Sequence, residues 1–363
     1  MDGKKIISSF VPYKVNNPYA RNVMDILNNN GVETYPIKEC FSSLSNFRRT
    51  SVYNFNWFEN MEKKGLSSLA EFYAKMAILQ LLKLTRKKIV YTLHNKLPHH
   101  SSSNKYSGKL MRWLAKNSDA IVIMSEDSRQ VVDDLVRNDT AARKIYKIPH
   151  PTYCNNYDLN KSENLREKFG INKENIVFMF MGSISPYKNI EILIEAFKSL
   201  DNPQSNLIIA GRPLSAEYGD ALKNLIGDNK RVIPIFEYIP DEDMELYYNT
   251  SDIVVLPYSK VSSLNSGALY LSFTFSKTVI CPEIGSVNDI TDKSILYHYD
   301  YTTVNEHKEK LLLCMQEACK KNEEQPGSLL EQGKRAFTYL MENHNDEIIS
   351  ELYEQLYTQL TSK

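Results

Sequence analysis

Apolar and polar positions along this chain form two kinds of segment that follow one another in turn. The clearest case is residues 176–200. A continuous apolar run over 176–181 predicts a strand that is covered on both faces. A polar turn with Gly182 and Lys188 follows, and apolar residues then recur at helical spacing, at Ile190, Leu193, Ile194 and Phe197. This segment predicts a buried strand, a short loop and an amphipathic helix.

The same order is repeated along the chain. In the first half we expect strands at 6–10, 33–37, 51–55, 88–93, 120–124 and 145–148, and helices at 18–30, 66–84, 105–116 and, capped by Ser125, up to about residue 137. In the second half we expect strands at 176–181, 206–210, 231–236, 253–256, 278–281 and 294–297, and helices at 189–200, 216–226, 241–248 and 266–275. Strands separated by helices predict parallel sheets joined by right-handed crossovers.

Length and order together predict an α/β protein with two Rossmann-like domains that face a cleft. The expected boundaries are 1–165 for the N-terminal domain and 166–335 for the C-terminal domain. The final helical stretch, from about 329 to 360, is too long for one crossover. We therefore expect residues 336–363 to form a helix that packs back on the N-terminal domain.

Composition narrows the class of protein. With 42% hydrophobic and 24% charged residues, the chain resembles a soluble globular protein. The sequence contains neither a run of about 20 apolar residues nor a signal-peptide pattern at its start, so we expect a cytoplasmic protein, with a peripheral position on the inner face of the cell membrane as a further expectation. Five scattered cysteines without a paired spacing argue against a disulfide framework and a structural zinc site.

The net charge of zero hides two opposite halves. Residues 1–150 hold 24 lysine and arginine residues and 13 acids, a net charge of +11, which leaves −11 for residues 151–363. Residues 72–118 contain ten basic residues and no acid. This region is either a solvated basic face or a surface for an anionic partner. Apolar residues at helical spacing favour an anionic membrane over a nucleic acid: Tyr73, Leu79, Leu82, Leu110, Trp113 and Leu114.

The turn at Gly182 and Lys188 carries candidate chemistry. Ligands of open α/β sheets bind where a strand passes into a helix, because the helix N-terminus and free N–H groups attract anions. Gly182 allows close approach to the backbone, and Lys188 adds a positive charge. A phosphate-bearing ligand is one interpretation. The other is an ordinary turn with a solvated lysine.

Several motifs in order resemble those of the GT-B glycosyltransferases, specifically the large retaining family of bacterial capsule, exopolysaccharide and glycolipid enzymes. The motifs are Met181-Gly182-Ser183 with Lys188 and Leu193-Ile194-Glu195-Ala196-Phe197, then the segments 251–258, 262–269 and 272–280, and in the first half 91–99 and 148–153. The resemblance covers essentially the whole chain. It implies a hexosyltransferase that moves a sugar from a nucleoside diphosphate donor to a glycan or lipid-linked acceptor in bacterial surface polysaccharide biosynthesis.

By this resemblance the donor site consists of Gly182, Ser183, Lys188, Arg212, Ser263, Asn265, Ser266 and Gly267. Lys188 and backbone amides at 265–267 would stabilise the departing diphosphate, so neither a metal nor another cofactor is expected. Most members of the family have an arginine where Ser183 stands. Arg212, at another predicted strand end, is either its replacement or an ordinary surface arginine.

On the acceptor side, the resemblance implies that His94 binds a sugar hydroxyl or transfers a proton, and the other interpretation is a histidine satisfied at a strand end. Asn95 and Asn17 are expected near the acceptor or the donor phosphates. The family's two donor-site glutamates correspond to Ser263 and Leu271, so donor identity and stereochemical outcome stay open. Two alternatives to the transferase therefore remain: a GT-B nucleotide-sugar epimerase and a non-catalytic partner subunit.

Overall fold

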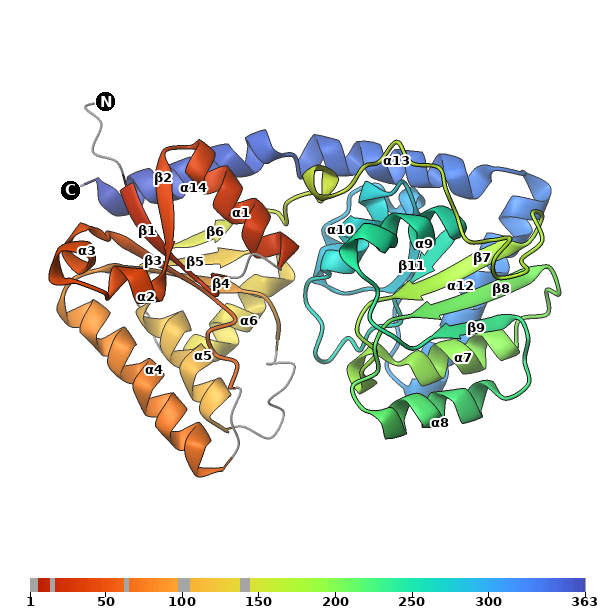
Figure 1. Cartoon of the computed structure of the whole chain (residues 1–363), viewed down its shortest axis with the longest axis horizontal. Helices are drawn as coiled ribbons and strands as arrows, with labels where there is room; N and C mark the ends of the chain where they lie inside the picture. Colours follow the sequence, from red (N-terminus) through yellow and green to blue (C-terminus); the bar gives the residue numbers. More distant parts are fainter. Residues whose placement is uncertain (1–5, 14–16, 62–64, 97–104, 138–143, 363) are drawn as a thin grey trace. The chain divides into compact units, whose positions relative to one another are not determined.

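The computed structural model describes residues 6–13, 17–61, 65–96, 105–137 and 144–362. The chain folds as two compact units (Figure 1). The first unit comprises residues 1–151, 261–265 and 343–363, and the second comprises 152–260 and 266–342. The two candidate regions identified in the sequence, around Lys188 and around His94, therefore lie in different units.

The first unit contains a six-stranded parallel sheet in the order β2-β1-β3-β4-β5-β6. Its strands are β1 (Ile6–Val11), β2 (Val32–Pro36), β3 (Val52–Asn56), β4 (Lys88–Leu93), β5 (Ala120–Ile123) and β6 (Ile145–Lys147). Strand β3 is buried along its whole length and pairs with β1 on one side and β4 on the other. Its carboxyl end is therefore central in the sheet.

Helices cover both faces of this sheet (Figure 1). One face packs on α1 (Pro18–Asn29) and α14 (Asp346–Thr361), and the opposite face packs on α4 (Leu66–Leu84), α5 (Lys105–Asn117) and α6 (Asp127–Val136). Two short helices, α2 (Ile37–Cys40) and α3 (Leu44–Arg49), follow β2. Side chains of alternating strand positions enter the two apolar clusters, as expected for a sheet covered on both sides.

A buried polar cluster connects α14 to the sheet. Ser8 Oγ lies 3.0 Å from the Tyr357 hydroxyl, and Asn54 Nδ2 donates to Ser8 Oγ at 2.7 Å and also to the Tyr357 hydroxyl. All three side chains are almost completely buried. Because each polar group in this cluster has a partner, the helix is held in one position without the penalty of an unsatisfied buried group.

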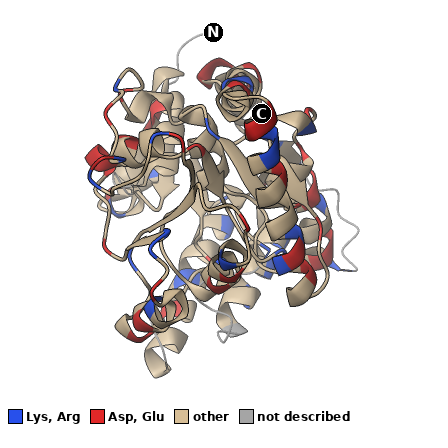
Figure 2. Cartoon of the chain, turned by 90° about the vertical axis from the view of Figure 1, so that its right-hand side faces the viewer, with Lys and Arg blue, Asp and Glu red and all other residues tan. Residues whose placement is uncertain are grey.

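The second unit contains a six-stranded parallel sheet in the order β12-β11-β10-β7-β8-β9. Its strands are β7 (Ile176–Met181), β8 (Ser205–Ala210), β9 (Val232–Ile235), β10 (Ile253–Val255), β11 (Thr278–Pro282) and β12 (Tyr297–Tyr299). None of them carries a lysine, arginine, aspartate or glutamate, and the strands are accordingly uncoloured in Figure 2. Burial on both faces leaves no place for an unpaired charge along these strands.

The helices of the second unit include α7 (Ile190–Lys198), α8 (Ala216–Ile226), α9 (Met244–Thr250), α10 (Gly267–Thr274), α11 (Gly285–Asn288), α12 (Val304–Glu324) and α13 (Ser328–Asn343). Helix α7 packs against both α8 and α12. Short 3₁₀ turns lie at Cys154–Asn156, Pro186–Lys188, Asp241–Asp243 and Lys293–Ile295.

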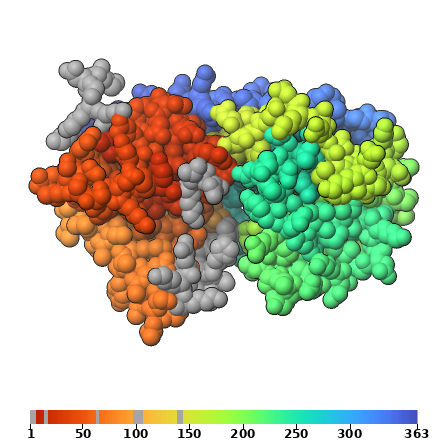
Figure 3. Space-filling model, viewed as in Figure 1, coloured from red at the N-terminus to blue at the C-terminus, as the bar shows by residue number. Residues whose placement is uncertain are grey.

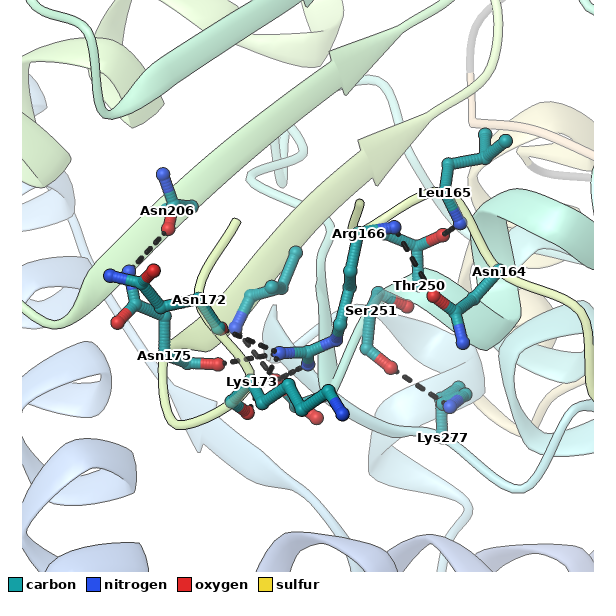
Figure 4. Close-up of polar contacts among 12 residues, drawn as sticks. Asn164, Leu165, Arg166, Asn172, Lys173, Asn175, Asn206, Thr250, Ser251 and Lys277 are labelled. Atoms are coloured by element: carbon teal, nitrogen blue, oxygen red, sulfur yellow. Dashed lines mark hydrogen bonds and ion pairs between the residues drawn. The ribbon is translucent and has the colours of Figure 1, made fainter. Parts of the chain in front are cut away.

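Figure 4 shows a polar network at the amino ends of β7 and β10. Arg166 Nη2 lies 2.6 Å from Asp252 Oδ2, and Arg166 Nη1 donates to the Asn175 carbonyl at 2.9 Å. Asp252 also accepts a hydrogen bond from the Val177 amide at 2.7 Å. Nearby, Lys277 Nζ donates to the Ser251 carbonyl at 2.8 Å. These charges meet partners at the sheet edge opposite to the strand ends that face the candidate site.

The predicted fold class is confirmed: the protein is α/β, with two parallel sheets built from alternating strands and helices. Three elements differ from the expectation. The sequence analysis missed α12, although Thr303 and Glu306 form a capping box at its start. Strand β12 begins at Tyr297, after a 3₁₀ turn, instead of at 294. The final stretch is two helices, α13 and α14, and Asn345 caps the second one.

One further local expectation was wrong. Helix α6 has Glu126 at its N-cap without a side-chain hydrogen bond, and Ser125 Oγ lies instead 3.0 Å from the hydroxyl of Ser128.

Within the residues that the structure describes, no helix is both long enough and apolar enough to cross a membrane.

Two helical glycines give a paired test of the packing. A Cβ on Gly333, in α13, would lie 1.9 Å from the Ser276 carbonyl oxygen, whereas a Cβ on Gly108, in α5, would meet no atom within 4 Å. We expect Gly333→Ala to lower the free energy of unfolding by about 1–3 kcal/mol, because the backbone has to move. Gly108→Ala should raise it by about 0.4–1 kcal/mol, because alanine favours the helix.

Urea denaturation followed by circular dichroism measures both changes. Equal effects of the two substitutions would contradict the close contact between α13 and Ser276.

Candidate functional site

The turns that follow β7 and β8 lie against each other. Gly182 has φ +136° and Gly211 has φ +143°, values that side-chain-bearing residues rarely adopt. The Gly182 amide donates to the Ala210 carbonyl at 3.0 Å, and a Cβ on Gly211 would come within 1.8 Å of the Gly182 carbonyl oxygen. Glycine is therefore required at 211, where the two backbones approach each other.

Beyond the glycines the two backbones stay paired for a few residues. The Ile184 amide donates to the Arg212 carbonyl at 3.0 Å, and the Leu214 amide donates to the Ile184 carbonyl at 2.8 Å. Ser183 and Arg212 are both exposed. The structure thus places the Arg212 backbone beside the turn that holds Ser183, with its side chain in solvent.

Two hydrogen bonds hold the loop of Lys188 against the segment that follows β10. Asn189 Nδ2 donates to the Pro257 carbonyl at 2.9 Å, and the Ser259 amide donates to the Tyr187 carbonyl at 3.1 Å. Asn189 has φ +53°, in the left-handed region, at the junction between the 3₁₀ turn and α7. Lys188 is therefore fixed at the carboxyl ends of β7 and β10, directly before a helix N-terminus.

The Lys188 ammonium rests on aromatic rings. Its Nζ lies 3.8 Å from the ring centroid of Tyr258 and 5.0 Å from that of Tyr187. Burial of the ammonium lowers the pKa of Lys188 to about 7, although the residue as a whole keeps some exposure to solvent. Among the residues that the structure describes, no carboxylate forms an ion pair with it. The ring faces offset part of the lost hydration, because they attract cations.

This arrangement suits an anion. A desolvated lysine without a carboxylate gains most from a negatively charged ligand, and the N-terminus of α7 favours the same charge. The neighbouring Cys281 is buried, and burial raises the pKa of its thiol, so it contributes no charge. A ligand anion would supply the missing counter-charge and raise the pKa of Lys188.

Ser266 and Gly267 begin helix α10. Ser266 is the N-cap: its Oγ accepts from the Leu269 amide at 3.2 Å, and its own amide donates to Ser286 Oγ at 3.0 Å. The capping role occupies the Ser266 hydroxyl oxygen and its amide in this structure. The contribution of this segment to an anion site would then come mainly from the first-turn amides beyond Ser266.

In the first unit, His94 lies directly after β4 and is largely buried. Its Nε2 lies 3.0 Å from Asn56 Oδ1, and its ring stacks on Trp57 with 3.7 Å between centroids. Asn56 Nδ2 donates to the Val11 carbonyl at 3.3 Å, which orients the amide so that Oδ1 faces the histidine. With Asn56 Oδ1 as the acceptor, Nε2 is the nitrogen through which His94 donates in this contact.

Ser263 and Asn265 belong to the same unit as His94, whereas Ser266 and Gly267 belong to the second unit. Asn265 Nδ2 donates to the His94 carbonyl at 3.2 Å. Asn265 Oδ1 is buried and has no hydrogen-bond partner among the described residues, and the side chain of Ser263 is buried as well. An unsatisfied buried oxygen is unfavourable, so a donor from a ligand or from water would stabilise it.

The remaining predicted residues have local roles that are visible in the structure. Asn17 is the N-cap of α1, and its Oδ1 accepts from the Ala20 amide at 3.2 Å. Asn95, next to His94, is buried. Asp241–Asp243 forms a 3₁₀ turn before α9, and among the described residues no three His, Cys, Asp or Glu side chains gather as a metal site requires.

Several residues beside the candidates escaped the sequence analysis. Tyr258 and Gly211 flank the Lys188 turn, and Asn56 and Trp57 flank His94. A signal existed for Gly211 and Asn56, since both lie at or directly after the end of a predicted strand. Glu59, two residues beyond Trp57, is also buried, and burial raises the pKa of its carboxyl group to about 7.

Comparisons with known proteins find similarity to glycosyltransferases. Residues 161–271 match the family model described as glycosyl transferases group 1. The chain is 22% identical over 285 residues to the GDP-mannose:glycolipid 4-beta-D-mannosyltransferase of Xanthomonas campestris, which covers 76% of this chain and 73% of that protein. It is 26% identical over 167 residues, 43% of each chain, to the lipopolysaccharide 1,2-N-acetylglucosaminetransferase of Salmonella typhimurium.

A solved structure extends this likeness to the whole fold. The Anabaena protein HepE, crystallised in complex with UDP, superimposes with a TM-score of 0.67 at 15% sequence identity, over 98% of this chain and 100% of its own.

The titration of Lys188 gives a test of the anion site. Since its pKa in the free protein is lowered to about 7, the lysine loses its charge as the pH rises above 7, and affinity for an anion should fall. We expect the ratio of pyrophosphate affinities, wild type over Lys188→Met, to fall by up to roughly tenfold per pH unit above pH 7. Isothermal titration calorimetry at pH 6.5, 7.5 and 8.5 measures it.

The effect of pH on the charge of pyrophosphate cancels in this ratio of affinities, because both proteins bind the same ligand. A ratio that does not change with pH would show that Lys188 is charged throughout or that it does not contact the anion.

Proposed function

We propose that this chain is a group 1 glycosyltransferase that transfers a hexosyl group from a nucleoside diphosphate sugar to a lipid-linked or glycan acceptor of the bacterial surface. The observation that carries the proposal is the desolvated Lys188 at the carboxyl ends of β7 and β10. The relatives that act on a glycolipid and on lipopolysaccharide support this class of acceptor.

In this proposal the second unit binds the donor. Lys188 contacts the diphosphate, and the turns at Gly182, Ser183 and Arg212 approach its oxygens. When the bond from the sugar to the diphosphate breaks, negative charge grows on the leaving oxygen. A fixed cation at that place stabilises the transition state more than the bound donor. Protonated Lys188 then replaces the metal ion that other transferases use for the same purpose.

The N-terminus of α10, at Ser266 and Gly267, adds backbone amides to the same charge. Ser263 and Asn265 stand where the family has a donor-site glutamate and its neighbours. The unpartnered Asn265 Oδ1 is suited to accept a hydrogen bond from a sugar hydroxyl. These contacts recognise the sugar through neutral groups instead of carboxylates.

We assign acceptor binding to the first unit, which α14 completes, and binding of the donor diphosphate to the second unit. Asn95 and Asn17 lie on the acceptor side. The acceptor then binds at the unit that contains His94 and residues 1–150, whose net charge is positive.

For the stereochemistry we propose inversion. The Xanthomonas relative is named as forming a β-mannoside from GDP-mannose, whose sugar is α-linked, so that enzyme inverts the anomeric carbon. An inverting displacement forms no covalent intermediate, so it needs no carboxylate nucleophile beside the anomeric carbon. It needs a general base for the acceptor hydroxyl, as in inverting glycoside hydrolases.

His94 supplies this base. Asn56 Oδ1 orients the ring through Nε2, and the imidazole takes the proton of the acceptor hydroxyl while the acceptor oxygen forms its bond to the anomeric carbon. On the opposite face the bond between that carbon and the diphosphate oxygen breaks, and its electron pair leaves with the diphosphate. The proton ends on His94, and the added negative charge ends near Lys188.

The donor assignment predicts the behaviour of Lys188→Met. Because the lysine has no ion-pair partner among the described residues and is partly desolvated, its removal should leave the melting temperature unchanged or higher. Thermal stabilisation by UDP-, GDP- or dTDP-sugars, screened in parallel, should disappear, and turnover should fall at least a hundredfold. Lys230→Met, an exposed lysine of the same unit, is the matched control and should behave as wild type.

Undiminished turnover by a folded Lys188→Met protein would exclude the diphosphate contact. If no nucleotide sugar raises the melting temperature of the wild-type protein, the result would favour the interpretation as a non-catalytic subunit.

The base assignment predicts the behaviour of His94→Gln. The amide preserves a donor toward Asn56 but cannot take a proton, so kcat should fall about 10²- to 10⁴-fold with little change in KM for the donor. The decline of wild-type activity at low pH should be absent in the variant. The coupling constant at the anomeric carbon of the product, measured by NMR, should show inversion.

Glu59→Gln is the matched comparison, because Glu59 is the nearest other buried acid in sequence. If Glu59→Gln and not His94→Gln removes the low-pH decline, the base is Glu59. A retained anomeric configuration would exclude the single displacement.

A further inference from the structure

Helix α4 keeps two of its charged side chains, Glu71 and Lys75, on its inner side, while several of its apolar side chains are exposed. Glu71 and Lys75 form an ion pair of 2.9 Å with exposures of only 14% and 19%, and Lys75 Nζ also donates to the Asn60 carbonyl at 2.6 Å. By contrast, Leu66 is 87% exposed and Leu84 is 81% exposed. A helix that only packs on a sheet shows the opposite distribution.

Most of the exposed side chains on one side of α4 are apolar and form a stripe, with the uncharged Gln80 among them. Leu66, Tyr73, Leu81 and Leu84 recur along the same side of the helix, and Ala70 and Ala77 fill the positions between them. At 1.5 Å per residue the stripe is about 27 Å long. It contains no charged residue, and Figure 3 shows α4, in orange, uncovered along the edge of the first unit. A largely apolar strip of this length on a surface marks an interaction site.

A row of basic side chains lies on the neighbouring helix. Lys109, Arg112 and Lys116 of α5 are all exposed and are spaced by three and four residues, so they share one face. Helices α4 and α5 lie side by side, and the rings of Phe72 and Tyr106 meet between them at 5.0 Å.

Two more exposed cations, Lys83 and Arg86, lie at the C-terminal end of α4. The segment 72–118 has no acid to neutralise any of these charges.

The structure corrects the choice of residues made from the sequence. Leu79, Leu82, Leu110 and Leu114, which were expected on the membrane side, are fully buried in the core beneath the two helices. Helical spacing alone does not distinguish the inner face from the outer face when both are apolar. Of the residues named from the sequence, Tyr73 is on the exposed stripe.

We propose that α4 and α5 dock the protein on an anionic phospholipid bilayer, with α4 in the plane of the interface. Its stripe enters the boundary between headgroups and acyl chains, while the basic row of α5 contacts lipid phosphates. A second copy of the chain is a poorer occupant, since pairing through the stripe would bring two basic rows together. A nucleic acid would leave the leucines in water. The proposal does not depend on the reaction or on the identity of the donor.

The test uses the full chain and vesicle flotation. We expect the protein to float with vesicles of phosphatidylcholine that contain about 30% phosphatidylglycerol, and much less of it to float with phosphatidylcholine alone. Binding should weaken at about 0.5 M salt. Tyr73→Glu with Leu84→Glu should abolish the binding, because two charges would have to leave water. The control, Leu313→Glu with Leu330→Glu, alters two leucines of the second unit that are also more than half exposed, and it should bind as wild type.

The basic row has its own variant. Lys109→Gln, Arg112→Gln and Lys116→Gln together should reduce the partition coefficient on anionic vesicles about a hundredfold, from roughly fivefold per side chain. The control replaces three exposed lysines of the second unit and should change the partition coefficient by less than about fivefold. It combines Lys168→Gln, Lys223→Gln and Lys230→Gln.

Three outcomes would overturn the proposal. The first is a wild-type protein that does not float, or that floats equally with neutral and anionic vesicles. The second is equal loss in the variants and their controls. The third is a dimer in sedimentation velocity that Tyr73→Glu with Leu84→Glu dissociates, which would assign the stripe to self-association. Flotation does not require turnover. A protein that does not float would therefore leave the transferase proposal unchanged, and a catalytically inactive protein could still float.

Discussion

The burial of two parallel sheets on both faces is the constraint on which the other features depend. A strand covered on both sides cannot carry an unpaired charge, and the strands of the second unit carry none. Polar chemistry is therefore confined to the two edges where strands begin and end. At the amino edge, Arg166 meets Asp252 and several carbonyls. At the carboxyl edge, glycine turns let the chain reverse tightly, and Lys188 stands beside them.

These two cations of the second unit differ in a way that separates structural from functional roles. Arg166 has a carboxylate and backbone carbonyls at hydrogen-bond distance, so its charge is compensated within the fold. Lys188 has the rings of Tyr258 and Tyr187, and its pKa is lowered to about 7. A lysine charge without a counter-charge at a strand edge is unfavourable in the free protein. A bound anionic ligand would supply that counter-charge, which gives the lysine a functional role.

The fold could be largely predicted from the sequence because period and length alone distinguish buried strands from crossover helices. Strand β7 and helices α4 and α8 have the predicted limits. Helix α12 was missed, since its apolar residues are separated by many charges, and the break between α13 and α14 is set by one capping residue, Asn345.

The candidate site was less predictable than the fold, because its geometry depends on partners far apart in sequence. The pairing of His94 with Asn56 and the ring of Tyr258 over Lys188 leave no periodic trace. The outward face of α4 was hidden for another reason, since inner and outer leucines have the same spacing.

The contact between Ser8 and Tyr357 spans 349 positions of the chain. During synthesis, the second unit, which ends at residue 342, is translated before α14. One face of the first sheet must then wait uncovered while the rest of the chain is translated. The first unit is begun first and finished last, so its exposed strands are the ones that a chaperone would need to protect in a growing chain.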